Sequence, residues 1–400
     1  MRNRVIITEQ GENFLAKGQP WMYRSNLLCT EGEPSDGEIV DIFGERGNYL
    51  ATGFYSATSH IVVRILTHKE GGKIDESFFR ERIQKAWDFR KAVEKNNLSN
   101  CRIIFGDADG LPGLTVDRYN DVLSVQIVCA GMEQRKTIVY NDLKEILAAD
   151  GEKIAGIYER FDTKARVKEG LPLYKAPWGE GKCHTHQIIN ENGLKLNVDI
   201  ENGQKTGYFL DQKSNRLLVR ELASGMNVCD CFTHTGGFAL NAAYGHAAHV
   251  TAVDVSATAL AEGKANAELN GLTNKIDFVQ ADVFDYLDEL ETGAFDFIIL
   301  DPPAFTKSRR TVEHAYHGYL TINAKAMNVL RNGGYLATCS CSRYMETDLF
   351  EKMLKEAAAS QHVVLQQISV TQQNADHPII WTNDSTSYLK FFLFRISEEF

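Results

Sequence analysis

Two cysteines near the carboxyl end of the chain have the residue type and the position for nucleophilic chemistry. Cys339 and Cys341 stand two apart in the run 338–342, which closes a predicted strand, so both side chains would face the same side of a sheet. Whichever of them lies at the end of the strand would be beside Asp301, which ends the preceding predicted strand. A thiolate is a strong nucleophile, and by adding to carbon 6 of a pyrimidine it would prepare carbon 5 for a methyl group. Two small buried apolar cysteines are the alternative interpretation.

Acidic residues occur at the ends of four successive predicted strands. They are Asp230, Asp254, Asp282 and Asp301, and in an open parallel sheet ligands bind beyond the carboxyl ends of the strands. An acid after the second strand can accept hydrogen bonds from both hydroxyls of a ribose, and Asp282 is placed for an adenine amino group. The alternative is that each acid caps the helix that follows it, which explains one or two of the four but not the series.

The turn after the first of these strands distinguishes between cofactors. Residues 230–238 contain Gly236 and Gly237 but lack the G-x-G-x-x-G spacing of a pyrophosphate cradle. We therefore expect a nucleoside cofactor without a pyrophosphate, which favours S-adenosylmethionine. An NAD(P) oxidoreductase is the alternative.

The loop after the fourth strand would meet the substrate. Its sequence, Asp-Pro-Pro-Ala-Phe, is similar to the Asp-Pro-Pro-aromatic loop of amino-group methyltransferases, but Ala304 stands at the aromatic position and Phe305 follows one residue later. Phe305 would either stack on a target base or fill the core beneath the loop. The cations that follow, Lys307, Arg309 and Arg310, are candidates for contacts with RNA phosphates, and an ordinary solvated loop is the alternative.

The sequence pattern around these residues predicts a doubly wound parallel α/β sheet from about residue 205 onward. Apolar strands alternate there with amphipathic helices. The predicted strands are 226–231, 250–255, 276–280, 295–300 and 334–339, and the predicted helices are 236–245, 256–270, 283–290 and 314–331. Two long strands joined by a polar loop, 362–369 and 388–395, would complete this domain.

The first 200 residues predict two smaller domains. Short strands separated by turns suggest a compact barrel, and they lie at 5–7, 38–42, 49–55 and 61–66. A strong helix begins at Ser77 and is followed by a mixed α+β section. We therefore divide the chain into domains at 1–72, 73–200 and 201–400.

Composition and charge exclude several classes of protein. The 400 residues include 43 Lys and Arg against 53 Asp and Glu, and the net charge of −10 argues against holding nucleic acid by overall charge, although a local basic patch can still do so. No apolar run approaches the roughly 20 positions of a membrane-spanning helix, and the first residues lack a secretory pattern, so we expect a cytoplasmic protein without membrane contact. The close cysteine pairs have C-x-C and not C-x-x-C spacing, so we expect free thiols and no metal.

Five stretches together resemble the class I ribosomal RNA large-subunit methyltransferase I family, which makes 5-methylcytosine in 23S-type ribosomal RNA. They are Lys205–Gln212, the turn 231–238, Asp301–Phe305, Ser340–Ser342 and Tyr388–Phe391. Upstream, 20–23 and 53–56 look like the family's N-terminal PUA domain, and 109–118 looks like its central α+β domain. The resemblance extends over nearly the full chain.

The resemblance implies a Rossmann-like catalytic domain that uses S-adenosylmethionine, with large-subunit ribosomal RNA as partner and a homodimer as the assembly. It places the nucleophile at Cys341, with Asp301 as a second catalytic residue, and gives Cys339 no counterpart. Related enzymes often carry a cysteine directly after Asp-x-Pro or Pro-Pro to release product; here Ala304 stands there, so another base must act. The implied cofactor pocket is lined by Lys205, Thr206, Gly207, Tyr208, Asp211, Gln212, Phe232, Gly236, Gly237, Asp254, Asp282, Val283, Asp301 and Pro302.

Two further functions are compatible with the same fold. One is methylation of guanine or of another RNA base. The other is a non-catalytic module for RNA binding or ribosome assembly, against which the intact Asp301 and Cys341 speak.

Overall fold

The computed structural model describes residues 2–95, 97–179, 183–306 and 308–398. The chain forms two compact units. The first consists of Met1–Ile189, Val198–Leu210 and Ala375–Thr386, and the second of Asn190–Asn197, Asp211–Asn374 and Ser387–Phe400. The division into three domains at 1–72, 73–200 and 201–400 stays a prediction.

The first unit begins with a six-stranded sheet in the order β2-β6-β5-β4-β1-β3. Its elements are β1 (Arg4–Ile7), α1 (Glu9–Ala16), β2 (Trp21–Tyr23), β3 (Leu27–Glu31), β4 (Ile39–Gly44), β5 (Tyr49–Tyr55) and β6 (Ile61–Thr67). Buried residues alternate along β1 and β4, so Val5, Ile7, Val40 and Ile42 share one core. The four predicted strands are present, whereas α1, β2 and β3 are too short for their periodicity to mark them.

The rest of the first unit is built around a sheet in the order β11-β10-β9-β8-β7. Its strands are β7 (Asn100–Phe105), β8 (Leu114–Tyr119), β9 (Val122–Ile127), β10 (Gly156–Phe161) and β11 (Tyr174–Pro177), and its helices are α2 (Glu76–Glu94), α3 (Ala130–Glu133), α4 (Lys136–Ala149) and α5 (Lys164–Lys168). Asp75 caps α2 by accepting a hydrogen bond from the Phe78 amide, and Phe79 and Trp87 are buried. The predicted helix and mixed α+β section are confirmed. β12 (His186–Glu191) and β13 (Leu194–Asp199) form a separate pair.

The second unit contains a seven-stranded sheet in the order β16-β15-β14-β17-β18-β20-β19. Its strands are β14 (Asn227–Cys231), β15 (His249–Asp254), β16 (Ile276–Gln280), β17 (Phe295–Leu300), β18 (Leu330–Ser340), β19 (Val363–Thr371) and β20 (Lys390–Glu398). The pairs from β16 to β18 are parallel, and β20 runs antiparallel to both of its neighbours. The predicted doubly wound sheet is confirmed, and its order reverses between β14 and β17, where such sheets bind ligands.

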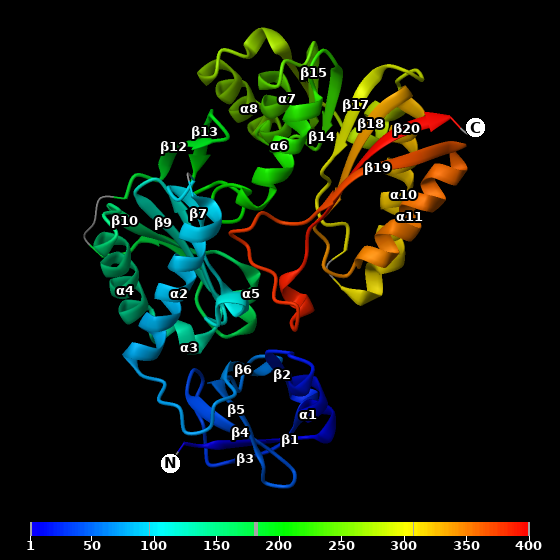
Figure 1. The fold of residues 1–400 in the computed structure, drawn as a ribbon. Coiled ribbons are helices and arrows are strands. Elements are labelled where there is room, and N and C mark those ends of the chain that lie inside the picture. Colours follow the sequence, from blue (N-terminus) through cyan, green and yellow to red (C-terminus); the bar gives the residue numbers. More distant parts are fainter. Residues whose placement is uncertain (1, 96, 180–182, 307, 399–400) are drawn as a thin grey trace. The chain divides into compact units, whose positions relative to one another are not determined.

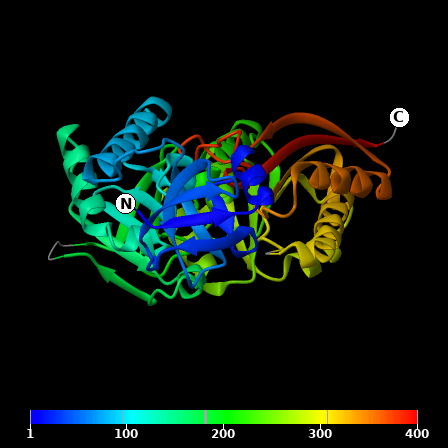
Figure 2. The ribbon, with the colours of Figure 1, turned by 90° about the horizontal axis from the view of Figure 1, so that it is seen from below.

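Helices cover both faces of this sheet (Figure 1). They are α6 (Lys213–Leu222), α7 (Gly237–Tyr244), α8 (Ala257–Leu269), α9 (Val283–Asp288), α10 (Val312–Val329) and α11 (Thr347–Ser360). α7 contacts both α6 and α8. α10 and α11 pack against each other, α10 against β18 and α11 against β19, and Figure 2 shows them as the yellow and the orange helix beside the last strands. In the described ranges, no helix is both long and apolar enough to cross a membrane.

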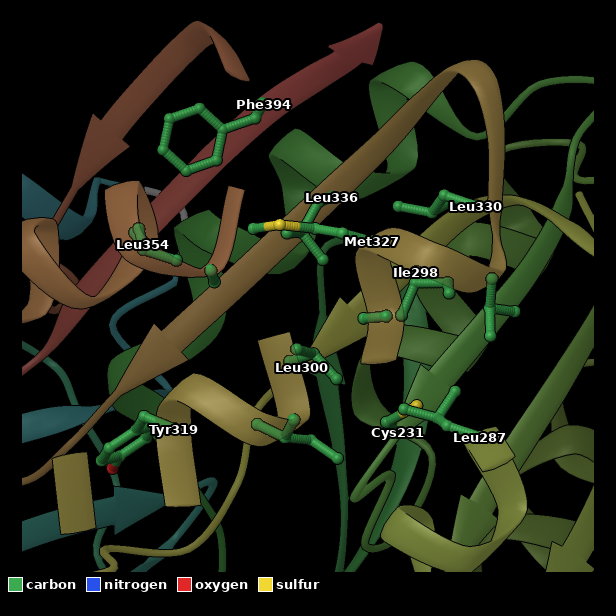
Figure 3. Close-up of a cluster of buried hydrophobic side chains, with 14 of the residues drawn as sticks. Cys231, Leu287, Ile298, Leu300, Tyr319, Met327, Leu330, Leu336, Leu354 and Phe394 are labelled. Carbon is green, nitrogen blue, oxygen red and sulfur yellow. The ribbon is translucent and has the colours of Figure 1, made fainter. Parts of the chain in front are cut away.

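A large apolar cluster holds α9, α10 and α11 against the strands (Figure 3). Cys231, Ile298 and Leu336 come from β14, β17 and β18, and Leu287 and Tyr319 meet them from the helices. All five side chains are at most 2% exposed. The core therefore fixes the carboxyl ends of the three central strands relative to one another.

Two helices of this unit are not among the predicted ones. α6 buries the polar Asn215 and Arg216, so apolar periodicity does not mark its inner face. α11 buries Phe350, Met353 and Ala357 at helical spacing, so the sequence did contain the signal for it.

Candidate active site

The turn after β14 has an unusual backbone. Phe232, His234 and Gly236 have φ values of 63°, 52° and 84°, and a left-handed conformation at a residue other than glycine costs on the order of 1 kcal/mol or more. The Asp230 carboxylate holds the turn, because its Oδ2 accepts hydrogen bonds from Thr233 Oγ1 at 2.5 Å and from the Ala239 amide at 2.8 Å. The turn thereby brings the first amides of α7 to the carboxyl edge of the sheet.

Asp230 itself is buried, and one of its carboxylate oxygens has no hydrogen-bond partner among the described residues. Its exposed fraction is 1%, and Oδ1 has no hydrogen-bond partner among the described residues. Burial, assisted by the negative charges of Asp301 and Asp254, raises the pKa of Asp230 to about 7. A cationic ammonium, such as that on the amino-acid part of S-adenosylmethionine, would satisfy this oxygen and favour its ionised form. The residues at this edge therefore fit that cofactor.

The two acids at the next strands differ in what they contact. Asp254 ends β15 and accepts hydrogen bonds from the His234 amide and from the Ser256 amide, both at 2.9 Å. Ser256, and not Asp254, caps α8. Asp282 is exposed and caps α9 by accepting a hydrogen bond from the Phe284 amide at 2.8 Å, so the capping interpretation describes Asp282 but not Asp254.

Asp301 lies at the point where the strand order reverses. It follows Leu300, which pairs with Cys231 of β14, and its Oδ1 accepts a hydrogen bond of 3.0 Å from Gln212 Nε2. The neighbouring Asp211 accepts a hydrogen bond of 2.6 Å from the Tyr388 hydroxyl. The structure thus joins residues from three of the motifs in one unit: 211–212, the Asp-Pro-Pro loop and Tyr388.

The other residues of the predicted cofactor pocket are placed as follows. Phe232 is half-buried, Gly236, Gly237 and Pro302 are buried, and Val283 is 1% exposed behind the cap of α9. Lys205, Thr206, Gly207 and Tyr208 belong to the first unit. There Thr206 Oγ1 donates to Asp117 Oδ2 at 2.5 Å, and the Tyr208 amide donates to the Tyr119 hydroxyl at 3.0 Å.

The two cysteines of the Ser-Cys-Ser strand have different surroundings. Cys339 is fully buried, whereas Cys341 is half-exposed. Burial raises the pKa of Cys339 well above its usual value, and the charge of Asp301 adds to this effect, so the Cys339 thiol stays protonated. Cys341 lies directly after β18 and is the more accessible of these two thiols.

Tyr319 of α10 holds the serines on either side of Cys341. Ser340 Oγ donates to the Tyr319 hydroxyl at 3.1 Å, and the Tyr319 and Ser342 hydroxyls share a hydrogen bond of 3.2 Å. Both serines are buried. Their two bonds to one hydroxyl fix the backbone that carries the thiol. No sequence pattern marks Tyr319, because the spacing that predicts α10 does not give its register against β18.

Lys390 is the second residue that the sequence analysis missed. It stands opposite Ser340 in the pairing of β18 with β20, is 6% exposed, and donates from Nζ to the Ser342 carbonyl at 2.8 Å. Burial lowers the pKa of Lys390 to about 8, against the raising effect of Cys341 and Glu346. The signal in the sequence was a lysine inside the apolar run 389–394.

In the loop after Asp301, the aromatic side chain packs inward and the described arginines are exposed. The Phe305 ring lies 4.6 Å from the Tyr319 ring and 6.2 Å from the Phe284 ring, centre to centre, so at least part of Phe305 fills the core beneath the loop. Arg309 and Arg310 are exposed in a short 3₁₀ helix, η5 (Arg309–Thr311). Lys307 lies outside the described residues.

Comparisons with known proteins identify the family of the chain and two of its domains. Residues 165–395 match the family described as S-adenosylmethionine-dependent methyltransferase, and residues 5–68 match a PUA-like domain. The ribosomal RNA large subunit methyltransferase I of Klebsiella pneumoniae (strain 342) is 38% identical over 397 residues, which are 98% of this chain and 98% of that protein. This chain belongs to the ribosomal RNA large subunit methyltransferase I family. The protein of the same name from Escherichia coli (strain K12) is 38% identical over 400 residues, 99% of this chain and 100% of that one.

Solved structures show the same fold. A chain from Streptococcus mutans, described as a SAM-dependent methyltransferase, matches with a TM-score of 0.81 at 22% identity and covers 98% of this methyltransferase and 99% of its own length. A second, described as a methyltransferase complexed with SAH, matches with a TM-score of 0.82 at 22% identity and the same coverage. The enzyme is thus a methyltransferase of the S-adenosylmethionine-dependent class with an N-terminal PUA-like domain.

Proposed function

We propose that this methyltransferase transfers a methyl group to carbon 5 of a cytosine in large-subunit ribosomal RNA, with Cys341 as the nucleophile. The observation that carries the proposal is the contrast between the two thiols. Cys341 is accessible beyond the end of β18, while Cys339 is buried beside Asp301. The choice of RNA follows the name of the relatives that are 38% identical over the full chain.

In the proposed reaction the Cys341 thiolate adds to carbon 6 of the cytosine and forms a sulfur–carbon bond. The electron pair of the 5,6 double bond then takes up the methyl group at carbon 5. The bond between this methyl group and the sulfonium sulfur of S-adenosylmethionine would break, which leaves S-adenosylhomocysteine. A base removes the remaining proton from carbon 5, the double bond forms again, and the sulfur–carbon bond breaks to release the thiolate. Because Ala304 replaces the cysteine that often follows Pro-Pro, that base is a different group.

The cofactor supplies the methyl group, and the acids of the sheet edge would hold it. We assign the ribose hydroxyls to Asp254, the adenine amino group to Asp282 and the ammonium to Asp230. Asp301, oriented by Gln212, would lie between the cofactor and the target base. Of the remaining predicted residues, those of the second unit, Asp211, Phe232, Gly236, Gly237, Val283 and Pro302, are proposed to line the rest of the pocket. The assignment of Lys205–Tyr208 stays a prediction from the sequence.

RNA would be held by the PUA-like domain, for which we propose the bounds 1–72, and by the rim after Asp301. Arg309, Arg310 and Lys307 would contact phosphates, and Phe305 would support a base that has left its stack. A thiolate reaches only a flipped or single-stranded base, so the target lies in a loop. We further propose that the enzyme acts in the cytoplasm and as a homodimer, which light scattering would test.

The decisive experiment traps the covalent intermediate. RNA that contains 5-fluorocytosine cannot lose a proton from carbon 5, so it should remain attached to the wild-type enzyme and to Cys339→Ser but not to Cys341→Ser. Cys339→Ser is the matched control, because it removes a thiol from the same strand. Attachment through Cys339 would reassign the nucleophile, and methyl groups found on a ring nitrogen or on guanine would refute the proposed reaction.

A further inference from the structure

Lys390, from a distant part of the chain, contacts the backbone on either side of Cys341. β20 inserts between β18 and β19 and places Lys390 opposite Ser340, one residue before the thiol. The Lys390 ammonium then reaches past the strand end to the carbonyl of Ser342, one residue after the thiol. Lys390 is therefore anchored on both sides of Cys341.

This lysine is unusual because a buried ammonium normally has a carboxylate partner. Its hydrogen bond at 2.8 Å goes instead to the neutral Ser342 carbonyl, and its exposed fraction is 6%. Burial lowers the pKa of Lys390 to about 8, and the charges that oppose this effect are those of Cys341 and Glu346. An anion at Cys341 would thus stabilise the buried cation, and the cation would stabilise the anion by the same amount.

Four of the titratable groups near this strand end contribute no positive charge. Tyr319 of α10 and Cys339 of β18 are neutral near pH 7, since burial raises the pKa of each. Asp301 acts on Cys339 as a negative charge, and Glu346, before α11, acts on Lys390 as one. Both carboxylates would oppose ionisation of a nearby thiol.

We propose that Lys390 is the positioning residue that stabilises the thiolate form of Cys341 and holds the backbone that carries it. The thiol proton leaves to solvent, and the ammonium stays protonated at its hydrogen bond to the Ser342 carbonyl. This inference rests on the proposed role of Cys341 as the nucleophile. Thiols beside lysine have lowered pKa values in other proteins, and here the cation is already buried before substrate binds.

The test measures the thiolate directly and needs no RNA. The full-length enzyme is treated with iodoacetamide from pH 5 to pH 10, and alkylation of the Cys341 peptide is followed by mass spectrometry. We expect the midpoint of the Cys341 profile to rise by about one pH unit or more in Lys390→Met, which means about tenfold slower labelling at pH 7. Lys390→Arg should keep the midpoint near that of the wild type.

Two controls separate this effect from general damage. Lys355→Met removes an exposed positive charge on α11, and the exposed Cys29 reports on reagent chemistry in every sample; neither should change. Circular dichroism and thermal melting identify a variant that has not folded, and if Lys390→Met fails that check Lys390→Gln takes its place.

The outcomes are distinct from those of the proposed function. An unchanged Cys341 midpoint in a folded Lys390 variant, or a shift that Lys390→Arg does not reverse, would overturn the role of Lys390 even if the fluorocytosine complex still forms. Failure of that complex, with the midpoint still shifted by Lys390→Met, would instead refute the nucleophile assignment and leave the ion pair in place.

Discussion

At the scale of single residues, the acids at the sheet edge follow equivalent strands but differ in burial and in hydrogen bonding. Asp230 is buried with an oxygen that lacks a partner among the described residues, Asp254 is held by two backbone amides, and Asp282 is an exposed helix cap. Their contributions to cofactor binding should therefore differ.

Replacing Asp254 should weaken cofactor binding in a folded protein. Asp254→Ala removes the acceptor of the proposed charge-assisted hydrogen bonds to the ribose, which contribute about 1.5–3 kcal/mol, so we expect affinity for S-adenosylmethionine to fall about tenfold to a hundredfold. Isothermal titration calorimetry measures this, with exposed Asp285→Ala as the control. Unchanged affinity would show that the second strand does not hold the ribose.

Asp230 should make stability depend on pH. Because burial raises its pKa from 3.8 to about 7, the folded protein binds a proton more tightly than the unfolded chain, and stability must fall as the pH rises from about 4 to about 7. Asp230→Asn keeps an oxygen acceptor but cannot ionise. Relative to this variant, the wild type should lose on the order of a few kcal/mol of unfolding free energy between pH 4 and pH 7, and little more above that. Urea unfolding at several pH values tests this, and parallel curves for the two proteins would contradict it.

At the scale of elements, α10 is coupled to the end of β18 through one hydroxyl. Tyr319 lies in the core beneath the strand (Figure 3) and bonds the serines on both sides of Cys341. The helix thus supports the proposed nucleophile and also covers the sheet.

The variant Tyr319→Phe tests this link between α10 and the end of β18. The ring packing stays, but two buried serine hydroxyls lose their shared partner, so we expect the unfolding free energy to fall by about 1–3 kcal/mol and methyl transfer to fall with it. Tyr316→Phe is the matched control on the same helix, because the Tyr316 hydroxyl bonds Glu356 at the surface, and it should change stability by less than about 0.5 kcal/mol. Equal effects of the two variants in urea unfolding would argue against a special role for Tyr319.

At the scale of the whole molecule, charge constrains how RNA can bind. The net charge of −10 repels a polyanion, so affinity must come from a few local cations.

We expect the rim after Asp301 to supply some of them. Reversing Lys307, Arg309 and Arg310 to glutamate should weaken RNA binding and reduce the slope of log affinity against log salt by about 0.7–0.9 for each phosphate that the protein no longer neutralises. Reversing Lys352 and Lys355, exposed on α11, serves as the control. If the triple variant binds RNA with an unchanged salt slope, the phosphates are bound elsewhere, and the PUA-like domain becomes the first place to look for their partners.

The sequence by itself determined the class of the protein and the ends of its strands. Apolar runs separated by amphipathic helices marked β14 to β18 within a few residues, because burial on both faces of a parallel sheet leaves a local signature. Since acids such as Asp254 and Asp301 directly end such runs, their place at the carboxyl edge also followed from the chain alone.

Only the tertiary structure decided how deeply these residues are buried and which charges surround them. Cys339 and Cys341 look alike in the sequence, and their difference in burial comes from what packs over the strand end. The contact of Lys390 with the backbone beside Cys341 requires β20 to insert antiparallel next to β18, a pairing between distant segments that no local pattern encodes. Ionisation depends on burial and on neighbouring charge, and both are set by segments that meet only when the chain folds.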